Sequence, residues 1–335
     1  MTSYLTRNRI AEATRDEQPA GPWELTVYSV QLVADRVIAL RLGAVDGGVL
    51  PAWTPGAHLS VRLPSGLVRE YSLCGDPRDR HTYRIAVLDE PNGRGGSAEF
   101  HRTVRAGGPL TVEGPRNHFE LVPARRYFFV AGGIGITPIL PMIGQAALDG
   151  ADWTALYGGR SRRSMAFLDE LRDVAGGKVT AVPEDEHGLP DLEVFLSEAT
   201  PEDAVYCCGP PGLIQAVESR CAARGLRRAL HVERFGAAPD RGIAETERAV
   251  EVELRRAGRT VTVPPGTSIL RAVREVVPGV AWSCAEGYCG TCEVTVLDGV
   301  PDHRDAVLSE DERAAGDCMM ICVSRARTPN LALDV

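Results

Sequence analysis

The last quarter of the chain contains four cysteines with the spacing C-x4-C-x2-C-x29-C. They are Cys284, Cys289, Cys292 and Cys322. This is the spacing of plant-type [2Fe–2S] sites, in which four thiolates hold two irons. Three ligands in one short loop require the backbone to wrap closely around the metal, and Gly287 and Gly290 give it that freedom. The C-terminal region must therefore fold around a loop that turns its sulfurs inward.

Two alternatives to this ligand set stay open. A structural zinc site also uses cysteines, although zinc ribbons usually have two short Cys pairs rather than three ligands in one loop. Cys318, which lies shortly before Cys322, is a competitor for the fourth position. The chain has 9 cysteines, and its first residues lack the apolar core of a secretory signal. An odd count without an export signal favours metal binding or free thiols over a disulfide framework.

The N-terminal third has the pattern of an antiparallel β-barrel. Residues 1–22 are polar and aperiodic, and we expect a loose tail there. Between residues 23 and 118, short β-type runs are separated by turn sequences such as Asp46-Gly-Gly and Pro64-Ser-Gly. Several short strands at this spacing predict a small barrel.

Two segments of this barrel suit a ligand that has both a phosphate and an aromatic ring. In the expected strand around residue 70, a period of two places Arg69, Tyr71 and Leu73 on one face, with the Ser72 hydroxyl beside them. Arginine binds phosphate, and tyrosine packs against aromatic rings. The glycine-rich segment 93–97 precedes a helical stretch and is a second candidate phosphate site. An ordinary exposed barrel edge is the structural alternative.

Residues 119–235 alternate strands with helices, which predicts an α/β domain with a parallel sheet. The run 126–131 is continuously apolar and is followed by Ala131-Gly-Gly-Ile-Gly-Ile-Thr-Pro138 and a helix. Helices are also expected at 164–174 and 213–224. The glycines allow close approach of a pyrophosphate, while Thr137 is expected to cap the helix and Pro138 to begin it. Because Pro138 replaces the third glycine, the segment is not a standard Rossmann fingerprint.

A second strand-to-helix turn strengthens the nucleotide interpretation. Tyr206-Cys-Cys-Gly-Pro-Pro-Gly212 places Cys208 and Gly209 at the carboxyl edge of the same sheet, where ligands of open α/β sheets bind. Residues 236–246 lack periodicity and are expected to be a linker. From residue 247 onward, an alternating pattern predicts a β-hairpin, followed by a helix from Thr267.

Composition excludes several classes of protein. The net charge of −8 argues against a nucleic-acid partner. No apolar stretch approaches the length needed to cross a bilayer, so we expect no membrane association and a cytoplasmic location. Histidines are scattered and no catalytic triad or carboxylate pair is recognisable, which leaves no certain catalytic residue.

In this order, the three regions resemble the ferredoxin-reductase superfamily, and their combination is similar to the phthalate dioxygenase reductase family, including reductases of vanillate demethylase type. The resemblance covers residues 23–335. It implies a multidomain α+β fold with an antiparallel β-barrel flavin domain (23–118), an α/β NAD(P)-binding domain (119–235), a linker (236–246) and a β-grasp-like ferredoxin domain (247–335).

The resemblance also implies roles for particular residues. FMN would be bound by residues of the barrel, which are Arg69, Tyr71, Ser72, Leu73, Gly95, Gly96 and Ser97. The nicotinamide site would be lined by Gly133, Gly135, Thr137, Cys208, Gly209 and Pro210. Near the flavin ring it places Glu233 and Phe235.

The resemblance and the residues favour different nicotinamide cofactors. The resemblance favours NADH. The segment after the expected second strand of the sheet instead contains Arg160, Arg162 and Arg163, and arginines accept the 2′-phosphate of NADPH. NADPH is therefore the alternative.

The function implied is that of a monomeric reductase component. A hydride carries two electrons whereas an iron–sulfur cluster accepts one, and a flavin divides the pair. Electrons would pass from NAD(P)H through FMN and the [2Fe–2S] cluster to a separate oxygenase, of Rieske type or a cytochrome P450. Two other functions remain as alternatives: a non-catalytic redox or nucleotide sensor with a metal-binding C-terminal domain, and a flavin reductase that releases reduced flavin.

Overall fold

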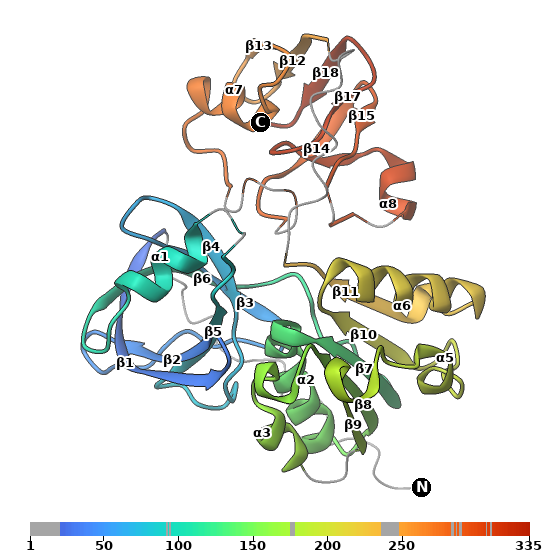
Figure 1. The fold of residues 1–335 in the computed structure, drawn as a ribbon. Helices are drawn as coiled ribbons and strands as arrows, with labels where there is room; N and C mark the ends of the chain where they lie inside the picture. Colours follow the sequence, from blue (N-terminus) through green and yellow to red (C-terminus); the bar gives the residue numbers. More distant parts are fainter. Residues whose placement is uncertain are drawn as a thin grey trace, which may run out of the picture.

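The computed structural model describes residues 21–91, 93, 95–174, 178–235, 248–282, 285, 287, 290–305, 307–308 and 310–335. Figure 1 shows three lobes, with the orange to red C-terminal lobe above the blue barrel and the green to yellow nucleotide lobe. The expected tail lies almost entirely outside the described residues, and so does the expected linker.

The first lobe is a six-stranded antiparallel sheet in the order β4-β3-β6-β1-β2-β5. Its elements are β1 (Trp23–Ala34), β2 (Val37–Ala44), β3 (Ala57–Arg62), β4 (Val68–Ser72), β5 (Tyr83–Leu88), α1 (Gly96–Thr103) and β6 (Pro109–Asn117). A bridge between Leu73 and Ile85 joins the two edges of the sheet and closes the predicted barrel. Both side chains are completely buried in the barrel core.

The second lobe is a parallel sheet in the order β11-β10-β7-β8-β9, as the sequence predicts. Its strands are β7 (Arg126–Gly132), β8 (Asp152–Gly159), β9 (Lys178–Pro183), β10 (Ala204–Cys208) and β11 (Leu230–Glu233). Its helices are α2 (Ile136–Leu148), α3 (Leu168–Arg172), α4 (Glu184–His187), α5 (Leu192–Phe195) and α6 (Pro211–Ala223), with 3-10 turns η1 (Gly133–Gly135), η2 (Arg162–Ser164) and η3 (Arg227–Ala229).

One expected helix is much shorter than its pattern indicates. The segment 164–174 forms only the single α-helical turn α3, preceded by η2. Phe167 lies before α3 with a φ of 59°, in the left-handed region, and this backbone conformation interrupts a continuous helix.

One hydrophobic cluster spans the first two lobes, and each of them has a further cluster of its own. A single cluster of buried residues contains Cys74 and Ala86 of the barrel together with Ile136, Leu140 and Tyr206 of the nucleotide lobe. Ile139 and Ile143 of α2 are completely buried in this cluster. This shared core fixes the carboxyl edge of the parallel sheet relative to β4.

The C-terminal lobe has a core of its own, formed by residues from 250 to 333. Its main sheet has the order β13-β12-β18-β14-β16, and β15 pairs with β17 separately. The elements are β12 (Val250–Leu254), β13 (Arg259–Val263), α7 (Ile269–Val276), β14 (Glu293–Asp298), β15 (Pro301–Asp302), α8 (Glu310–Ala315), β16 (Cys318–Met320), β17 (Arg325–Ala326) and β18 (Asn330–Leu333). The Ser268 hydroxyl accepts a bond from Arg271 N and caps α7, whose Ile269 and Val273 are completely buried under the sheet.

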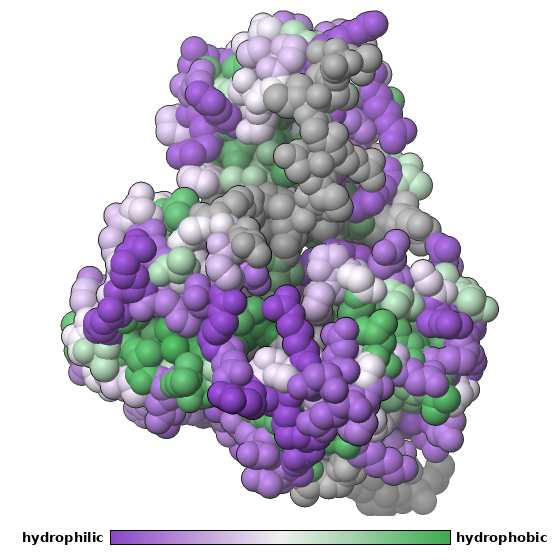
Figure 2. Space-filling model, in the orientation of Figure 1, coloured by the Kyte–Doolittle hydropathy of each residue, from purple (hydrophilic) through white to green (hydrophobic). Residues whose placement is uncertain are grey.

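The surface is mostly polar. On the face in Figure 2, hydrophilic residues predominate, and larger hydrophobic areas lie over the barrel and the nucleotide lobe. Among the described residues, no helix is both long and apolar enough to span a membrane.

Candidate functional site

Arg69 on β4 lies against the N-terminus of α1. A Cβ placed on Gly96 would be 2.5 Å from Arg69 Nε, so only glycine permits this approach. Gly95 has a φ of 80° and begins α1 without a side-chain cap, leaving main-chain N–H groups at the helix start. A guanidinium beside a helix N-terminus is suited to a phosphate. The two barrel segments that the sequence singles out are thus brought together.

The other candidate FMN-binding residues on and near β4 and α1 make different contacts within the protein. The Tyr71 ring makes an edge-on contact with Phe100 of α1 at 5.1 Å between centroids, and burial raises the pKa of its phenol. The Ser97 hydroxyl accepts a hydrogen bond from Glu90 N at 3.0 Å, which is a structural role. The Leu73 side chain lies in the barrel core, so only its main chain is available to a ligand.

Ser72, the last residue of β4, connects the barrel to the nucleotide lobe. Its buried hydroxyl donates to Glu233 Oε2 of β11 at 3.5 Å. Burial, followed by the nearby charge of Glu70, raises the pKa of Glu233 to about 8, and the bond from Ser72 opposes this shift. The carboxyl between the two lobes is therefore mostly protonated at neutral pH.

Glu233 also adjoins the predicted nicotinamide edge. It pairs in register with Cys208 on the neighbouring strand β10. Burial raises the pKa of the Cys208 thiol well above its usual value, and the Glu233 carboxyl adds to this shift. Cys208 is completely buried and remains a neutral thiol. Phe235, two residues beyond Glu233, is 38% exposed.

Two glycine-rich loops pack against each other at this edge. A Cβ on Gly135 would lie 2.3 Å from the Cys208 carbonyl oxygen, and one on Gly209 would lie 3.0 Å from Gly132 Cα. Gly133 has a φ of 54° and begins η1, while Pro210 precedes α6. Glycine is required here because the backbones of β7–α2 and β10–α6 touch. The N-termini of α2 and α6 consequently lie together at the carboxyl edge of the sheet.

The predicted helix cap at this loop is wrong. Thr137 lies inside α2, is 2% exposed, and its hydroxyl donates to Ile134 O at 2.9 Å. The helix begins at Ile136 directly after η1, so Pro138 is its third residue rather than its first. The glycine turn continues straight into the helix, which leaves no extended residue before it for a side-chain cap.

The three arginines after β8 are not equivalent. Arg162 forms a two-pronged ion pair with Glu186, with a closest distance of 2.8 Å. Arg163 lies 3.5 Å from Asp35 of the barrel. Arg160 is exposed and has no ion pair within the described part of the chain. Of the three, Arg160 is thus the one whose charge is not already neutralised by a carboxylate.

Two of the four predicted metal ligands are described, and they lie beside each other. Cys292 and Cys322 are 3% and 5% exposed. Ile321 N donates to Cys292 O at 3.3 Å, which holds the two cysteines on adjacent strand ends. Cys318 instead pairs in register with Thr295, further along β14, and burial raises its pKa to about 11. Cys284 and Cys289 lie outside the described residues.

The described parts of the cysteine loop fit a cluster. Gly287 and Gly290 have φ values of 77° and 76°, and Ala285 has a φ of 55°, so the loop curls repeatedly into the left-handed region. A Cβ on Gly287 would lie 2.5 Å from Val323 Cγ2. This curled backbone with buried thiols fits a [2Fe–2S] group held by cysteines.

The cysteine loop touches the barrel at Gly290, where an added Cβ would lie 3.6 Å from the His118 ring. The His118 and His58 ring centroids are 5.6 Å apart, and His58 Nε2 lies 3.8 Å from Glu70 Oε2. Burial, followed by the charge of His58, lowers the pKa of His118. A row of side chains thus extends from Glu70 of β4, through buried His58, to His118 beside the cysteine loop.

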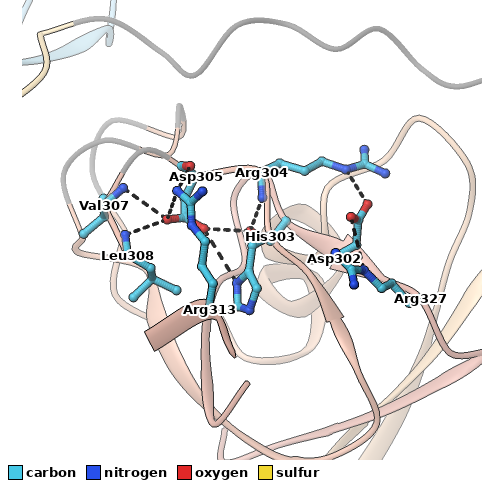
Figure 3. A network of polar contacts seen from close by, with 9 residues as sticks. Asp302, His303, Arg304, Asp305, Val307, Leu308, Arg313 and Arg327 are labelled. Atoms are coloured by element: carbon cyan, nitrogen blue, oxygen red, sulfur yellow. Dashed lines mark hydrogen bonds and ion pairs between the residues drawn. The ribbon is translucent and has the colours of Figure 1, made fainter. Parts of the chain in front are cut away.

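The buried Asp305 carboxylate is the centre of a network of polar contacts (Figure 3). Asp305 accepts hydrogen bonds from Val307 N at 3.1 Å and Leu308 N at 2.9 Å, and Ser324 Oγ donates to it at 3.3 Å. Arg313 Nη2 donates to the Asp305 carbonyl oxygen at 2.7 Å. The Asp305 Cα would lie 3.2 Å from a Cβ on Gly287, so this network is built directly behind the cysteine loop.

Sequence reasoning missed the residues of these two networks. Asp305 has a local signal, because an aspartate whose carboxylate accepts from the next two or three N–H groups is typical of a turn. His58, Glu70 and His118 have none, since strand pairing and lobe contacts bring them together from distant positions.

Comparison with known proteins agrees with this geometry. Residues 129–219 match the oxidoreductase NAD-binding domain family. Residues 252–327 match the 2Fe-2S iron-sulfur cluster binding domain family. The two matches coincide with the lobes that contain the paired glycine loops and the buried cysteines.

Similarity to curated proteins extends along nearly the whole chain. The chain is 43% identical to the phenoxybenzoate dioxygenase subunit beta of Ectopseudomonas oleovorans, over 94% of this chain and 98% of that protein. It is 39% identical to the vanillate O-demethylase oxidoreductase of Pseudomonas putida, over 90% of this chain and 96% of that protein.

Solved structures show the same arrangement. An intact type IV self-sufficient cytochrome P450 monooxygenase matches with a TM-score of 0.85 and 42% identity over 94% of this chain. This chain spans only 41% of that longer protein. Phthalate dioxygenase reductase, described as a modular structure for electron transfer from pyridine nucleotides to [2Fe–2S], matches with a TM-score of 0.68 and 35% identity, over 94% of this chain and 98% of that chain. The chain belongs to the phthalate dioxygenase reductase family of oxidoreductases, with NAD-binding and [2Fe–2S] domains.

Proposed function

We propose that this protein is the reductase component of an oxygenase system. It takes electrons from NADH through FMN and a [2Fe–2S] cluster and delivers them to a separate oxygenase, of Rieske type or a cytochrome P450. Similar proteins are named as parts of dioxygenase and demethylase systems, and one similar chain is fused to a P450. The partner is proposed as separate because the relative that this chain matches over 98% of its length is named as a subunit.

The observation that carries the proposal is the contact between the two candidate ligand edges. Ser72 follows the phosphate-suited Arg69 on β4 and bonds to Glu233, which pairs with Cys208 at the nucleotide edge. Bound flavin would supply the conversion between two-electron and one-electron transfer. The protein's part is to hold both ligands at this edge and to keep the carboxyl between them protonated, which avoids a negative charge there.

Particular residues are proposed for each ligand. Arg69, Gly95 and Gly96 would hold the FMN phosphate, with Tyr71 and Ser72 beside the ring system. The paired loops containing Gly135 and Gly209 would hold the dinucleotide. Cys284, Cys289, Cys292 and Cys322 would hold the cluster. We also propose a cytoplasmic monomer, because NADH is an intracellular reductant and one chain contains the entire relay; light scattering after gel filtration tests the monomer.

Spectroscopy and two matched cysteine variants test the function. The purified protein should show flavin and iron–sulfur absorption that bleaches with NADH, and HPLC of the released flavin should give FMN. Cys292→Ser should nearly abolish NADH–cytochrome c activity but spare ferricyanide reduction, since ferricyanide takes electrons from flavin directly. Cys318→Ser should change neither, because Cys318 lies away from Cys292 in the register of β14 and β16.

Three results would refute the proposal. A colourless protein would exclude the relay. A coloured protein that barely oxidises NADH, even with cytochrome c, would favour a redox or nucleotide sensor. Cytochrome c reduction that survives Cys292→Ser would favour release of free reduced flavin.

A further inference from the structure

A solvent-open groove lies beside the cysteine loop, on the face of α7. It has a volume of about 330 Å³ and is lined by α7 residues together with Trp282 and Ala285. We call it the α7 groove and define it by Arg271, Arg274, Trp282 and Ala285. Ala285 is exposed and immediately follows the proposed ligand Cys284. The groove therefore opens next to the loop proposed to hold the cluster.

The two ends of this loop have different surroundings. At Gly290, the loop lies against His118 of the barrel, the side from which electrons would arrive. At Ala285, the loop is exposed and lines the α7 groove. Ala285 is thus more open to an external protein than Gly290, which is partly covered by His118. A partner protein bound at the groove would thus be well placed to take electrons from the cluster.

The groove presents positive charge on a lobe in which acidic residues outnumber arginines. Arg271 and Arg274 lie one turn apart on α7 and are both exposed, and within the described residues neither has an ion pair. The Arg274 guanidinium lies 4.2 Å from the centre of the half-buried Trp282 ring. By contrast, Arg256 and Arg304 of the same lobe pair with carboxylates. Among the described residues that line the groove, Glu275 is the one acidic side chain.

We propose that the α7 groove is the docking site for an acidic surface of the protein that accepts the electrons. This inference rests on the proposed function and adds to it the location and the charge of the partner. Carboxylates of the partner pair with Arg271 and Arg274, while Trp282 supplies the apolar contact at the centre. Arginine and tryptophan are the residues that most often dominate protein interfaces. Opposite charge on the partner speeds its encounter and orients it.

Charge-neutralising variants test the groove. The test variant combines Arg271→Gln with Arg274→Gln. The control variant combines Arg228→Gln with Arg259→Gln, which removes the same charge from exposed arginines outside the groove. Both variants should retain the wild-type visible spectrum, because none of the four side chains is buried.

The probes are two one-electron acceptors of opposite charge: acidic cytochrome b5 and basic cytochrome c. In the test variant, kcat/KM for cytochrome b5 should fall about tenfold and its dependence on ionic strength should weaken. The Kd for cytochrome b5, measured by thermophoresis, should rise by a similar factor. Rates with cytochrome c should stay the same or increase, and ferricyanide reduction should not change. The control variant should behave like the wild type.

Two outcomes would overturn the docking site. Equal effects of the test and control variants on cytochrome b5 would show that only overall charge matters. An equal loss with cytochrome c and cytochrome b5 in the test variant would indicate damage to the cluster loop. Failure of the proposed function is distinguishable from both, because cytochrome reduction would then be absent in the wild-type protein or would survive Cys292→Ser.

Discussion

Glu233 combines a structural and an electrostatic role in one carboxyl. It joins β11 to Ser72 of the barrel, and its raised pKa of about 8 reflects burial beside Glu70. Its ordinary value is 4.5, so the folded protein binds this proton more tightly than the unfolded chain. The stabilisation is complete below pH 4.5 and is lost as the pH rises toward 8.

Glu233→Gln should remove this pH dependence. Relative to the wild type, the variant should gain roughly 1 to 2 kcal/mol above pH 8, allowing for the partial solvent access of the carboxyl. The measurement is the urea midpoint at pH 5 and pH 9. The same substitution at exposed Glu202 is the control, and an identical pH profile in wild type and Glu233→Gln would contradict the raised pKa.

Arg160 offers a test of nucleotide preference. Since Glu186 and Asp35 already pair with Arg162 and Arg163, a 2′-phosphate at the end of β8 would meet the charge of Arg160. Arg160→Gln should lower kcat/KM for NADPH about tenfold and leave that for NADH nearly unchanged. Arg163→Gln is the matched control in steady-state assays with both nucleotides. Equal losses with NADH and NADPH would show that Arg160 does not contact the phosphate.

The two glycine loops depend on close contact between their backbones. Gly135→Ala would place a methyl group 2.3 Å from the Cys208 carbonyl, so the β7–α2 loop must move. We expect KM for NADH to rise at least tenfold with little change in the iron–sulfur spectrum. Gly144→Ala on α2 meets nothing within 4 Å and should leave KM unchanged. An unaltered KM in Gly135→Ala would mean that the loop does not bind the nucleotide.

The Asp305 network should determine how well the cysteine loop retains iron. Asp305→Ala leaves Val307 N, Leu308 N and the Ser324 hydroxyl without their acceptor, at a cost of about 1–3 kcal/mol for each buried group left unpaired. We expect a lower iron content and a changed EPR signal of the reduced cluster. Asp302→Ala removes the neighbouring surface pairs with Arg304 and Arg327 and should affect neither (Figure 3). Full iron content with an unchanged EPR signal in Asp305→Ala would refute this role.

Local features of these elements could be predicted from the sequence, whereas contacts between elements could not. The glycine loops and buried strands depend on neighbouring residues, so their patterns revealed the parallel sheet and the barrel. The start of α2 was misjudged because threonine followed by proline is typical of a helix start, while here η1 precedes it. The Ser72–Glu233 bond joins residues far apart in the chain, and nothing local in the sequence reveals it.

The hydrophobic cluster between the barrel and the nucleotide lobe is separate from the core of the C-terminal lobe, so we expect the two parts to unfold at different temperatures. Barrel and nucleotide lobe share a cluster that includes Leu140, whereas Val252 belongs to the separate C-terminal cluster. Calorimetry should resolve two transitions. Leu140→Ala should destabilise only the first unit, by about 2–5 kcal/mol, and Val252→Ala only the second. A single transition lowered by both variants would show that the cores unfold together.

The separate core of the C-terminal lobe also determines how the molecule would fail. If oxidants or chelators remove the iron, we expect only the C-terminal lobe to unfold. The barrel and the nucleotide lobe would stay folded, because the cluster that joins them contains no residue of the C-terminal lobe. Without the cluster, the enzyme would still oxidise NADH but could not pass electrons to its partner. Its reduced flavin would react with dioxygen instead. Protein that has lost its cluster would therefore produce hydrogen peroxide, which rapid cluster repair or proteolysis would limit.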